Sequence, residues 1–188
     1  MTRSNSVDYL ARLREVLDAY PYDSFEAVVR LLAEARDEGR RIYVMGNGGS
    51  ATTASHWVCD MNKGCAGTAP RFRMFALNDS VPTVLAYAND ASYEAVFVEQ
   101  LKNHLEPDDL AIGISASGNS PNVVGALQFA AEIGARTAGL VGCGGGRVAA
   151  VVDVALTVPS SDMQLIEDVH VVTMHMLMQR FAAPGAGC

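Results

Sequence analysis

The sequence predicts an α/β protein with three layers, in which a doubly wound parallel sheet of five strands is covered by helices on both faces. Short apolar runs alternate with longer segments of helical periodicity along most of the 188 residues. The short runs are hydrophobic at nearly every position, as expected for strands that are buried on both sides. Hydrophobic residues make up 49% of the chain, which is sufficient for a packed core at this length.

The elements follow in a regular order. Two amphipathic helices come first, because apolar side chains recur at helical spacing over residues 8–19 and 24–38. The first strand, residues 41–46, is an apolar run that ends in a glycine. Further strands are predicted at residues 73–77, 110–115, 137–141 and 151–159, and helices at residues 51–63, 92–103, 121–133 and 163–181. We expect residues 1–188 to form a single domain, with residues 1–40 as a helical extension that packs on it.

The last predicted helix, residues 163–181, is apolar around nearly its whole circumference. A helix of this kind is buried by more than one neighbour. It is either a central core helix or part of a subunit interface, with Met174 and Met178 among the candidates for outward-facing residues. A chain of this size has a limited interior, which favours the interface.

Composition narrows the range of partners. The net charge is −7 and the isoelectric point is about 5.0, so no nucleic-acid partner is expected. The N-terminal segment is amphipathic and charged, unlike a signal peptide. The longest uncharged run, residues 110–131, contains serine, asparagine and proline, so no membrane partner is expected either. Four cysteines without a C-x-x-C spacing suit reduced thiols in a cytoplasmic protein.

Two turns at strand ends carry small polar residues. Gly46 to Ser50 follow the first strand, and Ser115 to Ser120 follow the third. Glycines allow close backbone approach, and free N–H groups at the start of a helix attract anions. Pro121 suits the first turn of a helix, with Ser120 as its N-cap. Either turn alone could be an ordinary connection, but together they predict a site for a phosphate monoester at the carboxyl ends of the strands. No lysine follows the first turn as in a P-loop, which disfavours a kinase or NTPase.

Histidines and carboxylates recur at helical spacing on two helices. His56 and Asp60 are four residues apart and share a face, although a solvated pair would also explain them. Glu167 and His175 are eight residues apart on the apolar last helix, where polar groups need partners. The two pairs would satisfy one another around a metal, and imidazole with carboxylate suits zinc. The neighbouring His170 is interpreted as a hydrogen-bonded core histidine.

Three segments carry a resemblance to a known family. MGNGGSA, SASGNSPNV and VPSSDMQLIEDVHVVTMH resemble the phosphoheptose isomerases, a branch of the sugar isomerase (SIS) domain proteins, and the likeness extends over nearly the whole chain. It implies a flavodoxin-like SIS fold in which the serine turns bind the substrate phosphate. The family usually has threonine at the position of Ala116, so one hydroxyl donor is missing here. The substrate-binding residues that the resemblance implies are Asn47, Gly48, Gly49, Ser50, Asn89, Asp90, Ser115, Ala116, Ser117, Ser120 and Glu167.

The resemblance also implies one zinc ion per subunit. Its ligands would be His56, Asp60, Glu167 and His175. The family has glutamate at the position of Asp60 and glutamine at that of Glu167, so two of the four ligands differ in this chain. Both substitutes can bind zinc, but aspartate reaches one methylene less and Glu167 adds a negative charge. The resemblance further suggests that Asp168 and His170 are supporting residues, and that Lys63 either meets the sugar or faces solvent.

The function that this resemblance implies is an aldose-ketose isomerase. Its expected substrate is sedoheptulose 7-phosphate, converted through an enediol to a D-glycero-D-manno-heptose 7-phosphate. Asp60 would be the base and His175 the acid, in a homotetramer. The alternative is a non-catalytic SIS domain that senses a sugar phosphate or acts as an assembly partner. Such relatives tend to lose the metal residues, which this chain retains, so the enzyme is favoured.

Overall fold

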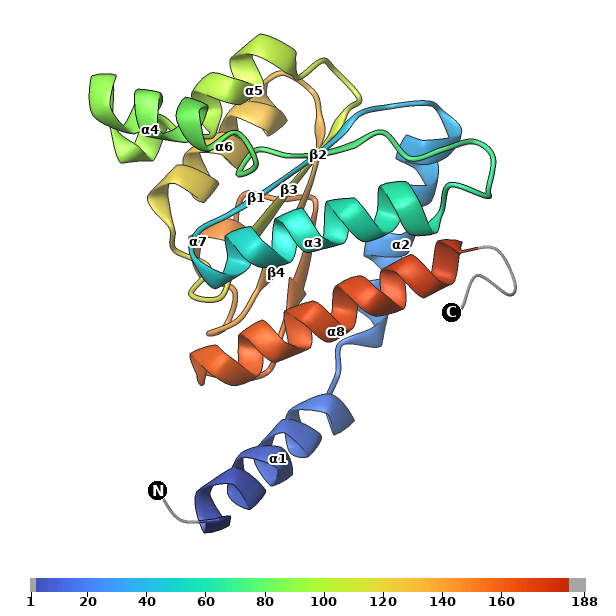
Figure 1. Cartoon of the computed structure of the whole chain (residues 1–188), viewed down its shortest axis with the longest axis vertical. Helices are drawn as coiled ribbons and strands as arrows, with labels where there is room; N and C mark the ends of the chain where they lie inside the picture. The colour runs from blue at the N-terminus through green and yellow to red at the C-terminus, as the bar shows by residue number, and fades with distance from the viewer. Residues whose placement is uncertain (1–2, 183–188) are drawn as a thin grey trace.

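The chain folds around one parallel sheet of five strands. The structure, a computed structural model, describes residues 3–182 (Figure 1). The strand order is β2-β1-β3-β4-β5, and every neighbouring pair is parallel. This order is that of a flavodoxin-like doubly wound fold, as the sequence predicts. The strands are β1 (Ile42–Gly46), β2 (Met74–Ala76), β3 (Leu110–Ser115), β4 (Arg136–Val141) and β5 (Val154–Thr157).

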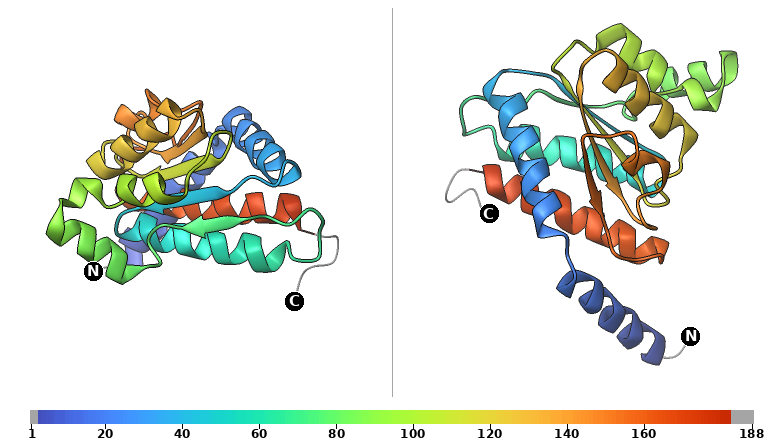
Figure 2. Two further views of the ribbon diagram at one scale, coloured as in Figure 1. Left: turned by 90° about the horizontal axis from the view of Figure 1, so that it is seen from above. Right: turned by 180° about the vertical axis from the view of Figure 1, so that it is seen from behind.

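Helices cover both faces of the sheet, which gives the predicted three layers (Figure 2). Alternate strand residues point to opposite faces, so Val44 and Ile112 join one hydrophobic cluster while Tyr43 and Ala111 join the other. The first face carries α2 (Tyr22–Asp37), α3 (Gly49–Gly64) and α8 (Met163–Phe181). The second carries α4 (Val81–Asp90), the 3₁₀ helix η1 (Tyr93–Ala95), α5 (Val98–His104), α6 (Pro121–Glu132) and α7 (Gly146–Ala149).

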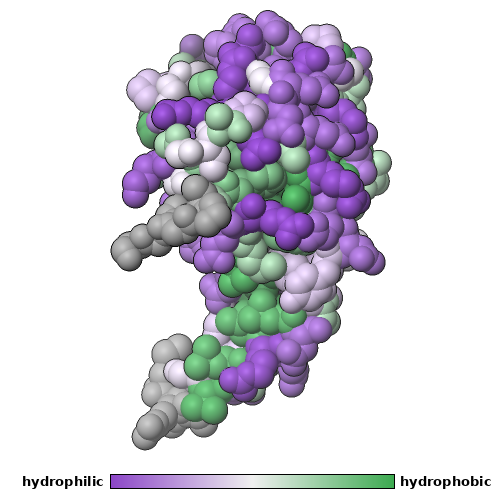
Figure 3. Space-filling model, turned by 90° about the vertical axis from the view of Figure 1, so that its right-hand side faces the viewer, coloured by the Kyte–Doolittle hydropathy of each residue, from purple (hydrophilic) through white to green (hydrophobic). Residues whose placement is uncertain are grey.

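The first helix, α1 (Arg3–Asp18), extends away from the sheet and contacts the start of α8 (Figure 1). The hydroxyl of Tyr9 donates to Asp168 at 2.6 Å, and Arg12 pairs with Asp162 at 2.6 Å. Val7 and Leu10 remain 63% and 61% exposed. Hydrophobic side chains accordingly gather on the surface of α1 (Figure 3).

The structure differs from the sequence prediction in several places. Residues 81–90 form α4, a helix that the sequence analysis did not predict. No residue of α4 is buried, and its half-buried Val84, Tyr87 and Ala88 pack on the second hydrophobic cluster. The helix predicted at residues 92–103 is divided into η1 and α5. The last strand begins only at Val154, because α7 and its following turn occupy the residues before it.

Much of the apolar surface of α8 is covered within one protomer, although Met163 is 41% exposed and Val172 and Met176 are half-buried. The helix packs against α1, α2 and α3, which cover it on several sides. Met174 is fully buried, so the suggestion that it faces outward is wrong. Met178 is only partly buried and lies against Gly64 of α3. Among the described helices, including α8, none has the length and apolarity to cross a membrane.

A glycine in the central strand controls how closely α6 packs on the sheet. A Cβ at Gly113 would lie 2.5 Å from Val123 Cγ1 and 2.7 Å from Leu127 Cδ1. We expect Gly113→Ala to lower the free energy of unfolding by about 1–3 kcal/mol, because α6 must shift. Gly125→Ala is the matched control, since a Cβ there meets nothing within 4 Å. Urea unfolding should show the control unchanged or stabilised by up to about 1 kcal/mol. Equal stability losses in the two variants would contradict this account.

Candidate active site

The two polar turns lie at the point where the chain reverses its winding. Gly46 at the end of β1 is paired with Ile114 near the end of β3. From these adjacent strands, α3 leaves toward one face of the sheet and α6 toward the other. In open parallel sheets the crevice at such a switch point is where ligands bind. We call residues 46–50 the glycine turn and residues 115–120 the phosphate turn.

An asparagine pair joins the glycine turn to the start of α6, next to the phosphate turn. Asn47 Nδ2 donates to Asn122 Oδ1 at 2.8 Å, and Asn122 Nδ2 donates back to Asn47 Oδ1 at 2.9 Å. Tyr93 also donates its hydroxyl to Asn47 Oδ1, at 2.8 Å. The side chain of Asn47, expected to bind substrate, is therefore engaged in holding the turns together. Sequence reasoning did not identify Asn122 or Tyr93, because their contacts join distant segments.

The phosphate turn has its carbonyl groups occupied and several N–H groups free. The oxygens of Ser115, Ala116, Ser117 and Gly118 each accept a hydrogen bond. Within the described chain, the N–H groups of Ala116, Ser117 and Ser120 have no such partner. The backbone therefore offers an array of donors suited to an anion, even though Ala116 contributes no hydroxyl.

The serine hydroxyls of this turn lie together. Ser115 Oγ and Ser120 Oγ are 3.0 Å apart. Ser120 occupies the N-cap position of α6, and Pro121 follows it as predicted. Its hydroxyl does not cap the helix, however, because it is bonded to Ser115 instead. This leaves the start of α6 without a side-chain cap.

In the glycine turn, a carboxylate lies close to the start of α3. A Cβ at Gly49 would be only 2.9 Å from Glu167 Oε2, so a larger residue here would require the Glu167 carboxylate to move. A carboxylate is favourable beside a helix N-terminus, where the peptide dipoles leave partial positive charge. The neighbouring Ser50 is 5% exposed, and Gly48 has a φ of 54°. Glu167 thus occupies part of the space that the sequence assigned to substrate.

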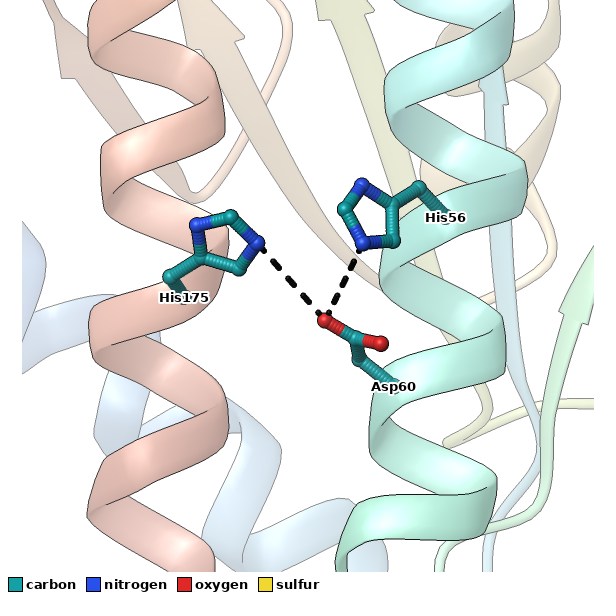
Figure 4. A group of neighbouring side chains, drawn as sticks. All are labelled: His56, Asp60 and His175. Carbon is teal, nitrogen blue, oxygen red and sulfur yellow. Dashed lines mark ion pairs between the residues drawn. The ribbon is translucent and has the colours of Figure 1, made fainter. Parts of the chain in front are cut away.

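Two histidines and an aspartate meet between α3 and α8 (Figure 4). Asp60 Oδ2 lies 3.3 Å from His56 Nε2 and 3.7 Å from His175 Nε2. One ligand atom from each of the three residues can be chosen so that all lie within 4.8 Å of one another. The side chains of His56 and His175 are 50% and 47% exposed, so a ligand can reach them. Glu167 is not part of this group, since it lies two turns earlier on α8.

The other expected residues lie apart from this group. Asn89 and Asp90 are exposed at the end of α4, where Asn89 Nδ2 donates to Asp90 Oδ1 at 2.7 Å. A cavity of about 210 Å³ separates α4 from the glycine turn, with Leu85 and Tyr93 in its wall. Lys63 is exposed.

His170 is a buried histidine beneath the site, as the sequence suggested. It is 1% exposed, and its Nε2 lies 3.4 Å from the carbonyl oxygen of Val141 at the end of β4. Its Nδ1 is buried without a hydrogen-bond partner in the described chain. Burial lowers the pKa of His170 from 6.5 to about 4, with the contact to Val141 opposing the shift. The imidazole is therefore neutral at physiological pH.

Comparison with known proteins agrees with this geometry. The family model described as the SIS domain matches residues 7–142. A phosphoheptose isomerase from Geotalea daltonii is 40% identical over 158 residues, which cover 80% of this chain and 79% of the relative. The structure of a phosphoheptose isomerase from Neisseria gonorrhoeae superposes with a TM-score of 0.88 at 25% identity, covering 95% and 97% of the two chains. The corresponding protein from Francisella tularensis gives a TM-score of 0.88 at 23% identity and supports the fold, covering 97% and 99% of the chains.

The switch-point crevice, its serine turn and the family match together define the class: the chain belongs to the SIS domain family. Within that family it is an enzyme of the phosphoheptose isomerase branch, as the resemblance implied.

The buried His170 makes stability dependent on pH. Between pH 6.5 and about 4 the unfolded chain binds a proton at this residue that the folded protein excludes. Stability should therefore fall as the pH is lowered through this window, by about 3 kcal/mol from this group. In urea unfolding at pH 7 and pH 4.5, His170→Gln should lose less stability on acidification than the unsubstituted protein. His104→Gln, at an exposed histidine, should keep the original pH dependence. An unchanged dependence in His170→Gln would refute the assignment.

Proposed function

We propose that this enzyme isomerises sedoheptulose 7-phosphate to a D-glycero-D-manno-heptose 7-phosphate. The observation that supports this most is the presence of an accessible His/Asp group on α3 and α8, two turns along α3 from its start beside the phosphate-suited turn. Gly49 at the top of α3 and His56 are separated by about two helical turns, or ~10 Å. An extended seven-carbon sugar phosphate can span this distance, with its phosphate on Ser115, Ser117 and Ser120.

The His/Asp group suits proton transfer. An aldose-ketose isomerisation removes a proton from the carbon beside the carbonyl and returns it to the neighbouring carbon through an enediol. Asp60 would take this proton as the base. His175, through a ring N–H, would donate to the carbonyl oxygen as that oxygen gains negative charge. Both side chains are partly exposed, so substrate can approach them.

The same residues would hold zinc. Two imidazole nitrogens and one carboxylate oxygen form a donor set that zinc favours, with a further position left open as in catalytic zinc sites. Zinc supplies a Lewis acid that stabilises negative charge on oxygen. We retain Glu167 as a candidate fourth ligand. Its carboxylate would have to leave its place over Gly49 to reach the group.

The remaining substrate contacts are assigned to the residues around the turns. Backbone groups of Asn47 to Ser50 and of Ala116 would approach the substrate closely, and Asn89 and Asp90 would contact sugar hydroxyls. We further propose a homotetramer in the cytoplasm. The exposed Val7 and Leu10 of α1 give the apolar surface that another subunit would cover.

Turnover tests the proposed reaction. Zinc-loaded protein should convert sedoheptulose 7-phosphate to the aldose phosphate. Chromatography that separates the two sugar phosphates measures the conversion. Ser120→Ala should raise KM more than it lowers kcat, because the phosphate contact is the same in the ground and transition states. Sugar-phosphate binding without any turnover would reject the isomerase and favour a sensor.

Metal content tests the His/Asp group. The purified protein should hold about one zinc per chain. His175→Ala should lose most of it, because only two of the three ligands in the His/Asp group would remain. His104→Ala is the matched control, since His104 is an exposed histidine on α5. Elemental analysis of the purified variants gives the stoichiometry. Zinc that is retained in full by His175→Ala would show that the ion is bound elsewhere.

A further inference from the structure

The phosphate turn rests on a second glycine-rich turn that has no assigned role. This turn, residues 142–147, follows β4, and we call it the β4 turn. Gly142 N donates to Ala116 O at 3.1 Å, and the N–H of Val148, just after the turn, donates to Gly118 O at 2.8 Å. Two backbone hydrogen bonds therefore connect the phosphate turn to the end of the neighbouring strand.

The two turns approach more closely than side chains would allow. A Cβ at Gly118, which has a φ of 65°, would clash with Gly145 O. A Cβ at Gly146 would lie 2.6 Å from Gly118 O. Glycine is required on both sides of the contact, since any side chain would push the turns apart.

One side chain, that of Asn119, joins the two turns. Its Nδ2 donates to Ser117 O at 2.8 Å within the phosphate turn. Its Oδ1 accepts from Arg147 N, at the end of the β4 turn, at 3.1 Å. Both ends of one amide are thus used to hold backbone groups. Its own backbone N–H donates to Ser117 Oγ at 3.2 Å.

These contacts determine where the free donors of the phosphate turn point. In a trans peptide the C=O and N–H groups point in opposite directions. The Ala116 carbonyl is tied to Gly142, so the N–H of Ser117 points away from the β4 turn. The Ser117 carbonyl is tied to Asn119, which fixes the next peptide unit and the position of the Ser117 side chain.

We propose that Asn119 is a positioning residue for the phosphate site, which it serves by fixing the phosphate turn on the β4 turn. The proposal rests on the proposed phosphate site, and Asn119 need not touch the ligand itself. Without its amide, the Ser117 carbonyl loses its partner and the phosphate turn loses its side-chain link to Arg147 N. The Ser117–Gly118 peptide is then held only through Gly118 N, which donates to Ser115 O, so the neighbouring free donors are less firmly oriented.

Inorganic phosphate is the probe, and its Kd is measured by calorimetry on the whole chain. Asn119→Ala should raise the Kd about tenfold, since two hydrogen bonds that orient the turn are lost. Asn62→Ala is the matched control, because Asn62 also bonds one backbone segment twice: its Nδ2 donates to Met74 O at 2.9 Å and its Oδ1 accepts from Met74 N at 3.3 Å. It should lower the Tm but leave the phosphate Kd within about twofold.

A backbone variant isolates the contact between the turns. Arg147→Pro removes the N–H that Asn119 accepts, at a first-turn helix position where proline is tolerated. Arg147→Ala loses the same guanidinium but keeps the N–H. The proline variant should therefore have a Kd several-fold above that of the alanine variant.

The outcomes separate this proposal from the proposed reaction. Phosphate affinity that is unchanged in Asn119→Ala, or lowered equally in Asn62→Ala, would overturn the positioning role. An unsubstituted protein that binds no phosphate would overturn both the role and the phosphate site. A protein that shows the expected phosphate affinities but no turnover would keep the role of Asn119 and reject the isomerase.

Discussion

The parallel pairing of β1 with β3 is the constraint on which the site depends. It sets Gly46 opposite Ile114, so that the two polar turns emerge side by side while their helices diverge to opposite faces. The reciprocal bonds between Asn47 and Asn122 then close the gap between the turns. A shift of one residue in this pairing would separate the amides and turn the buried strand residues to the wrong faces.

The packing of α8 on α3 provides the second half of the site. Gly49 and Gly64 allow α8 to approach α3 near both ends, with Glu167 over one glycine and Met178 over the other. Between these contacts, His56, Asp60 and His175 face one another. The glycines at the two ends of the contact thus leave room for the Glu167 and Met178 side chains, and the polar residues meet between them.

Much of the fold could be predicted because its core elements carry strong patterns. The strands of the sheet are continuous apolar runs, and α3, α6 and α8 show clear starts and helical spacing. The α4 segment was missed because its apolar stripe, Val84, Tyr87 and Ala88, covers little more than one turn and is only half-buried. The β4 turn was not recognised because a run of glycines has no periodicity. Its role depends on the close contact with Gly118 in the phosphate turn, which the sequence does not show.

The candidate site could be predicted in part. Spacing on two separate helices indicated that His56, Asp60 and His175 could meet, and the fold brings them together. The place of Glu167 could not be predicted, because it depends on how far α8 slides along α3. Spacing along one helix shows which side of that helix a residue faces. It does not show how far one helix is shifted along the axis of its neighbour.

The absence of any buried residue in α4 has a consequence for substrate choice. The phosphate turn is ordered by backbone hydrogen bonds before a ligand arrives, so binding there costs little conformational entropy. The helix that carries Asn89 and Asp90 packs on the second cluster only through half-buried side chains, and segments with little buried surface open at low free energy. In the proposed function, the phosphate turn would be the rigid part of the site, and α4 the part that adjusts to the sugar.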